Sequence, residues 1–202
     1  VNGAIIAGNA PAERVSQLRG FWERVTAPTT SFPFLPFTEE ANRRWHAASA
    51  LLFGRSGFFG PRPITDWFGS PVSFYETKAL RSTLEAFIDF DRLNAGDTRF
   101  SVAAANVRTG DFAYFDSREI TIRPEHVMAS AALPPGFPPI EIDGEHYWDG
   151  GLVSNTPLQY VLDYVPRRSR LTFQVDVFNA EGPLPSDLDS AMEREKDIRY
   201  SS

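Results

Sequence analysis

Strand patterns alternate with helix patterns along the second half of the chain, and this alternation restricts the fold more than any other feature. The run RFSVAAANV at residues 99–107 is apolar and rich in small residues, which is typical of a strand buried on both faces. RTGD then predicts a turn into a second strand, FAYFD, and a helical run with Pro124 in its first turn follows. Strands interleaved with helices indicate an α/β sandwich.

A second hairpin is predicted at IEIDGEHYW, because Asp143 and Gly144 form a dipeptide that favours positive backbone φ angles between two short strands. Asp149 therefore comes at the exit of a strand. Gly150 and Gly151 follow it directly, and glycine lets a backbone pass close to a neighbouring group.

Apolar spacing elsewhere in the chain predicts further regular elements. Alternating apolar residues in LTFQVDVF predict one more strand, at residues 171–178. The predicted helices cover residues 1–7, 12–25, 38–53, 76–90 and 157–165.

Composition excludes several classes of site and partner. The sequence has 202 residues, which suits one ordinary domain, and it contains no cysteine, so disulfides, thiolate nucleophiles and cysteine-based zinc sites are excluded. A net charge of −6 argues against a nucleic-acid partner, which needs clustered Lys and Arg. The histidines His46, His126 and His146 show no metal-binding spacing, and we expect them to be structural.

Asp149 has two interpretations at this point. It is a turn residue whose side chain caps nearby backbone groups, or it is a catalytic carboxylate, since catalytic groups collect at strand ends in α/β sheets. In the second case, burial against Tyr147 and Trp148 would raise the pKa of the carboxyl group and make it a better general base. Spacing alone leaves both open.

Residues 74–158 resemble the later half of a patatin-like phospholipase domain of the bacterial type that carries a DGG motif. The resemblance rests on SVAAANVRTGDFAYF, on HVMASAALPPGFPPIEIDGEHYWDGGLVSNTPL and on the DGG itself, Asp149 to Gly151. VNGAIIAGN at the start is similar to the helix that leaves the nucleophile elbow in that family. We accordingly expect a partial acyl-hydrolase domain at residues 1–180 and the start of a C-terminal helical extension at residues 181–202.

The resemblance implies a three-layer α/β/α fold and lipid ester hydrolysis by a Ser-Asp dyad. In that chemistry a serine in a GxSxG elbow attacks the carbonyl, the aspartate of the DGG motif acts as base, and a glycine-rich loop supplies oxyanion donors. Asp149 is then the base, and Gly150 and Gly151 shape its loop. The substrate is a phospholipid or another acyl ester, and no metal or organic cofactor is needed.

No GxSxG occurs in the 202 residues, so the resemblance places the nucleophile and the oxyanion loop upstream of Val1. Ser130 and Ser154 lack an elbow, and we expect them to be packing and turn residues. The alternative is a catalytically inactive patatin-like protein that binds lipid or acts as a scaffold. A GxSxG motif upstream favours the enzyme, and its absence favours the binder.

Two aromatic loops, SFPFLPF and GFFGPRPITDWFG, also admit two meanings. They pack onto the core, or they contact an acyl chain or a lipid surface. The sequence leaves the location unknown: a cytoplasmic one is favoured, peripheral contact with a membrane is a second option, and the oligomeric state stays open.

Overall fold

A computed structural model describes residues 1–27, 39–163, 169, 171–175 and 177–201. The chain divides into two compact units, Val1–Asp149 and Gly150–Ser202. Over these described ranges, none of the helices has the length and apolarity that a membrane crossing requires. The predicted boundary at residue 180 stays a prediction.

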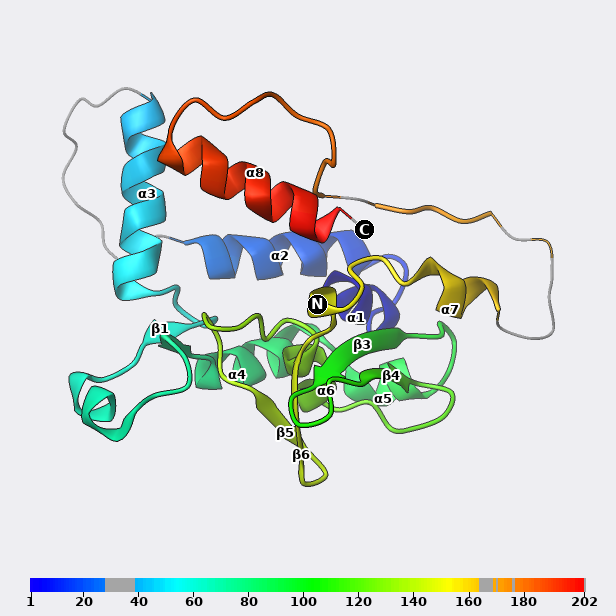
Figure 1. The fold of residues 1–202 in the computed structure, drawn as a ribbon. Coiled ribbons are helices and arrows are strands. Elements are labelled where there is room, and N and C mark those ends of the chain that lie inside the picture. The colour runs from blue at the N-terminus through cyan, green and yellow to red at the C-terminus, as the bar shows by residue number, and fades with distance from the viewer. Residues whose placement is uncertain (28–38, 164–168, 170, 176, 202) are drawn as a thin grey trace. The chain divides into compact units, whose positions relative to one another are not determined.

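The first unit combines helices with a four-stranded and a two-stranded sheet (Figure 1). Its α-helices are α1 (Asn2–Ala7), α2 (Arg14–Thr26), α3 (Glu39–Phe53), α4 (Lys78–Phe87), α5 (Phe90–Asn94) and α6 (Pro124–Ala129), and its 3-10 helix is η1 (Ile64–Gly69). Its strands are β1 (Gly60–Pro61), β2 (Tyr75–Glu76), β3 (Ser101–Asn106), β4 (Phe112–Asp116), β5 (Ile140–Ile142) and β6 (Glu145–Asp149).

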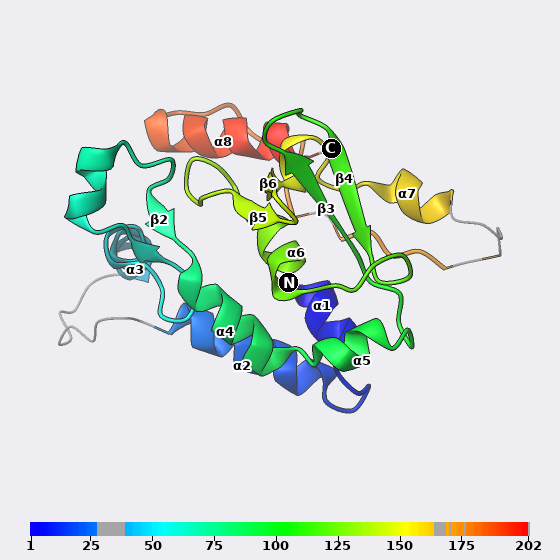
Figure 2. The ribbon, with the colours of Figure 1, turned by 90° about the horizontal axis from the view of Figure 1, so that it is seen from below.

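The main sheet has four strands in the order β4-β3-β6-β5, and all neighbours are antiparallel. Both predicted hairpins are confirmed, as β3-β4 and as β5-β6. Asp143 and Gly144 have φ angles of 51° and 86°, the two positive values that the turn dipeptide predicts. Helix α6 packs against β3, β5 and β6 and also against α4 (Figure 2). The predicted α/β sandwich is therefore confirmed.

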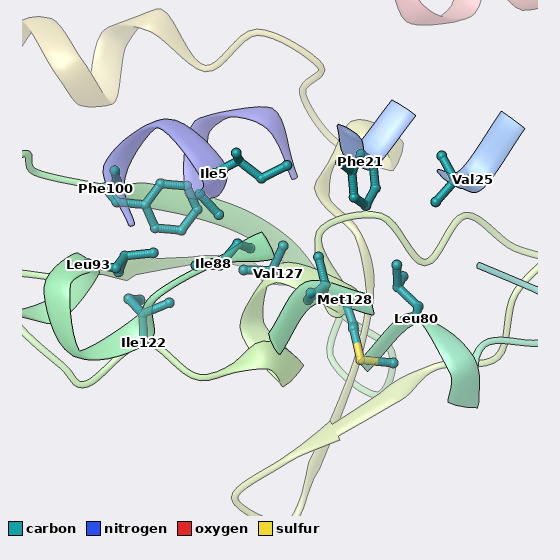
Figure 3. Packing of buried hydrophobic residues seen from close by; sticks show 13 residues of the cluster. Ile5, Phe21, Val25, Leu80, Ile88, Leu93, Phe100, Ile122, Val127 and Met128 are labelled. Atoms are coloured by element: carbon teal, nitrogen blue, oxygen red, sulfur yellow. The ribbon is translucent and has the colours of Figure 1, made fainter. Parts of the chain in front are cut away.

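The core of the first unit is a cluster of buried apolar side chains that come from these helices and from the segments between them (Figure 3). Ile5 of α1, Leu84 of α4 and Val127 of α6 are fully buried. Asn9, just after α1, donates its side-chain amide to the carbonyl oxygens of Ile5 (2.9 Å) and Phe87 (2.8 Å), so it joins the ends of two helices. Most of the stability of such short helices comes from this packing.

The helix predicted at residues 76–90 is α4, Lys78–Phe87, in the structure, and α5 begins at the last residue of that range, Phe90. Ile88 is extended, with φ −128° and ψ 118°, and it ends α4. The side chain of Asp89 then accepts a hydrogen bond from the backbone N–H of Arg92 (2.9 Å) and caps α5. Apolar spacing continues across the break because Ile88 is itself buried in the core.

The second unit contains the 3-10 helix η2 (Gly150–Leu152), α7 (Leu158–Leu162) and α8 (Leu188–Tyr200). The prediction of a strand at residues 171–178 was wrong for its described part, which has no regular structure. Leu171 and Phe173 are more than 80% exposed. A strand needs a neighbour to take its backbone hydrogen bonds, and no described strand pairs with this segment.

Candidate active site

Asp149 is the last residue of β6, as predicted, and its backbone is fixed on two sides. It lies opposite Ala104 of β3 in the sheet. Its backbone N–H donates to the carbonyl oxygen of Ala132 (3.0 Å), just beyond α6. The side chain is half-buried. Strand β3 and the residues just after α6 therefore both fix the backbone position of Asp149.

The start of α1 lies within electrostatic reach of this carboxylate. The backbone nitrogen of Val1 is buried, and the negative charge of Asp149 acts on it. The structure thus brings together the end of β6 and the beginning of α1. The DGG aspartate and the helix that resembles the sequel of the nucleophile elbow lie at the opposite ends of the first unit's sequence.

An aromatic stack supports the strand that carries Asp149. The rings of Tyr147 and Phe115 meet edge to face at 5.3 Å, and Phe115 lies 4.7 Å from the ring of His126. Tyr147 shares a sheet face with Asp149, because side chains two apart on a strand point the same way. This stack ties β6 to β4 and α6.

His126 is a structural residue, as predicted. It is buried, and its Nδ1 accepts a hydrogen bond from the backbone N–H of Arg123 (2.9 Å), the residue before the first turn of α6. Burial lowers the pKa of His126 below its ordinary value, and the charge of Arg123 acts in the same direction.

We expect the free energy of unfolding to fall between about pH 7.5 and about pH 5.5 more steeply in the native protein than in His126→Gln. The unfolded histidine takes up a proton near pH 6.5, whereas the folded one stays neutral to lower pH. The contribution of neutral His126 to the free energy of unfolding is thus fully present above about pH 6.5 and is lost as the pH falls below it. Glutamine keeps an acceptor for the Arg123 N–H. Urea unfolding across this pH range is the measurement, and equal slopes would contradict the prediction.

The glycines of the DGG motif open the second unit. Gly150 is buried and begins η2, and its carbonyl oxygen accepts hydrogen bonds from the backbone N–H groups of Val153 (2.9 Å) and Ser154 (3.0 Å). Gly151 is the middle residue of η2. The motif therefore changes the chain from a strand to a tight helical turn directly after Asp149.

The remaining candidate residues keep structural positions. Ser130 ends α6, where its backbone N–H donates to the carbonyl oxygen of His126 (3.2 Å). His146 and Asp149 are three apart on β6 and so point to opposite faces, as predicted. Asp143 is the predicted turn residue and forms an ion pair with Arg123 (2.9 Å). Within the described ranges, no group of three or more acidic or histidine side chains could hold a metal ion.

Sequence reasoning missed the backbone contact between Ala132 and Asp149. ASAALP and DGG both belong to the run that carries the resemblance, but the run does not show which of their main-chain atoms pair. A hydrogen bond between main-chain atoms leaves no mark on residue type, so this partner needed the structure.

A comparison with models of known families gives a match. The model of a family described as patatin-like phospholipase matches residues 1–162, which include α1, the sheet and Asp149. No curated protein matches the chain.

Proposed function

Because the chain belongs to the patatin-like phospholipase family, whose members are lipid acyl hydrolases, we propose that it takes part in hydrolysis of carboxylic esters of lipids, with Asp149 as the general base. The nucleophile in this proposal is a serine of a GxSxG motif upstream of Val1. The observation that carries the proposal is the position of Asp149 near the start of α1, where the two partners of the dyad would have to meet.

The proposed reaction has two halves. Asp149 accepts the proton of the serine hydroxyl while the serine oxygen attacks the ester carbonyl, and the tetrahedral intermediate places a negative charge on the carbonyl oxygen. Backbone N–H groups of the proposed upstream loop stabilise that charge. The leaving alcohol takes the proton from Asp149, and an acyl-serine remains. In the second half, water gives a proton to Asp149 and attacks the acyl-serine. The serine oxygen then takes that proton back, and the fatty acid is released.

The geometry supports Asp149 in this role better than any other described carboxylate near it. A base must stand within hydrogen-bond reach of the nucleophile, and a carboxylate on a fixed strand end reaches one place reproducibly. Ala104 and Ala132 fix the backbone of Asp149. By contrast, Asp143 points from an exposed turn and pairs with Arg123.

We expect the full polypeptide to release free fatty acid from phosphatidylcholine vesicles and to do so equally well in the presence of a metal chelator. The dyad needs only a serine, a carboxylate and oxyanion donors, so removal of divalent cations takes nothing from it. Titration of the released fatty acid is the measurement. Vesicle binding with no release would instead support the inactive, lipid-binding alternative, and a chelator that stops release would contradict the dyad.

A further inference from the structure

The loop between β1 and β2 exposes large apolar side chains. We call residues 62–74 the η1 loop, because η1 occupies its middle. Ile64 is 80% exposed, Phe68 91% and Val72 64%. Figure 1 shows this teal loop projecting from β1 at the lower left, with the short coil of η1 at its end. Large apolar side chains exposed on a projecting loop mark a surface for apolar contact.

The base of the η1 loop is closed by hydrogen bonds. The Nε of Arg62 donates to the hydroxyl of Ser73 (3.0 Å), and that hydroxyl donates to the carbonyl oxygen of Tyr75 (2.8 Å). The backbone N–H of Arg62 also donates to the carbonyl oxygen of Phe74 (3.3 Å). Because the base of the loop is fixed, the segment that carries Ile64 and Phe68 loses little conformational entropy when it binds.

The charges of the loop point to the chemistry of its partner. Arg62 and Asp66 are the only charged residues of the loop, and they form an ion pair with each other (3.5 Å). The loop is therefore neutral although the whole chain carries a charge of −6. A neutral apolar surface suits zwitterionic lipid, whereas an anionic surface would repel the rest of the chain.

We propose that the η1 loop inserts Ile64 and Phe68 into the surface of zwitterionic lipid and thereby holds the protein at its substrate. This rests on the proposed function, since the lipid is taken to be the substrate aggregate. Of the two interpretations of the aromatic loops, core packing fits Phe58 and Phe59, whose rings lie in a cluster with Phe137. The segment SFPFLPF lies outside the described residues.

The η1 loop is joined to the strand of Asp149 within the same unit. The backbone N–H groups of Phe74 and Tyr75 donate to the carbonyl oxygens of Pro135 and Gly136 (3.0 Å each). Only three residues before Pro135, Ala132 accepts the hydrogen bond of the Asp149 N–H. Insertion of the loop would therefore also fix the height of Asp149 relative to the lipid surface.

The test compares vesicle binding in variants of the full polypeptide. All carry Asp149→Asn so that phosphatidylcholine vesicles stay intact during sedimentation. Ile64→Ser with Phe68→Ser removes the apolar end, and Leu184→Ser with Leu188→Ser is the matched control, because those leucines are 94% and 75% exposed outside the loop. We expect vesicle affinity to fall at least about tenfold in the loop variant and to stay within about twofold in the control.

The proposal would be overturned if the loop variant bound vesicles as tightly as the parent. It would also be overturned if the loop and control variants lost vesicle affinity equally. A parent that does not bind the vesicles but forms a dimer that the loop variant breaks would assign the loop to a second copy of the chain. These outcomes do not depend on catalysis. Ester turnover that survives Asp149→Asn would contradict the proposed role of Asp149, and vesicle binding would then be measured with ether-linked phosphatidylcholine, which has no acyl ester to hydrolyse.

With Asp149 restored, hydrolysis separates the two roles again. The loop variant should cleave a soluble short-chain ester within about twofold of the native rate, because Ile64 and Phe68 lie outside the dyad. Its release of fatty acid from vesicles should fall at least about tenfold, in step with the lost binding. An equal loss on both substrates would show that the loop acts on the catalytic site itself, against the proposal.

Discussion

Asp149→Asn in the full polypeptide should lower kcat/KM for a chromogenic short-chain ester by about 10²–10⁴-fold, the usual contribution of a general base. Asparagine keeps the size of the side chain and can still accept a hydrogen bond, but it does not take a proton from a serine. Asparagine also leaves the backbone contacts of Asp149 to Ala104 and Ala132 in place, so the temperature of unfolding should stay nearly unchanged.

Asp143→Asn is the matched control for this prediction. Asp143 lies six residues earlier on the same hairpin, its side chain is 76% exposed, and asparagine tolerates its positive φ angle. Its ester turnover should equal that of the native protein. If Asp149→Asn keeps native turnover, Asp149 has no part in the chemistry and the proposed Ser-Asp dyad is wrong.

Asp116→Ala should lower the free energy of unfolding by about 3 kcal/mol or more, as expected when one partner of a buried ion pair is removed. The Asp116 side chain is fully buried at the end of β4. Its Oδ2 accepts hydrogen bonds from the Nε of Arg99 (2.7 Å) and the hydroxyl of Ser101 (2.7 Å), and its Oδ1 accepts one from the backbone N–H of Arg118 (2.9 Å). Alanine removes the acceptor from all three.

The control is the exposed ion pair between Arg92 and Asp97 (3.2 Å), whose side chains are 34% and 68% exposed. Asp97→Ala should change stability by less than about 1 kcal/mol, because solvent screens such a pair. Urea unfolding followed by circular dichroism measures both variants. Equal effects would show that the Asp116 cluster contributes no more than a surface pair.

The sequence predicted those parts of the fold that depend on local chemistry. Asp143 and Gly144 specify their turn through the φ angles they tolerate, so the β5-β6 hairpin and the place of Asp149 at its exit could be read directly. Pro124 likewise marked the start of α6.

Parts that depend on distant partners could not be derived in this way. The alternation at residues 171–178 matches a strand, yet a strand forms only where another strand accepts its hydrogen bonds. The end of α4 at Ile88 could not be predicted either. Ile88 is extended but also buried and apolar, so the helical spacing of apolar residues continues through it. The approach of Asp149 to the start of α1 spans the whole first unit, and only the family resemblance suggested it.

The measurement that tests the Ser-Asp proposal most directly is peptide mapping by mass spectrometry after treatment with a serine-directed fluorophosphonate. We predict one phosphonyl group per polypeptide, on a serine of a GxSxG motif upstream of Val1, with much slower labelling in Asp149→Asn. No adduct, or an adduct on a serine within residues 1–202 such as Ser130 or Ser154, would contradict the proposal.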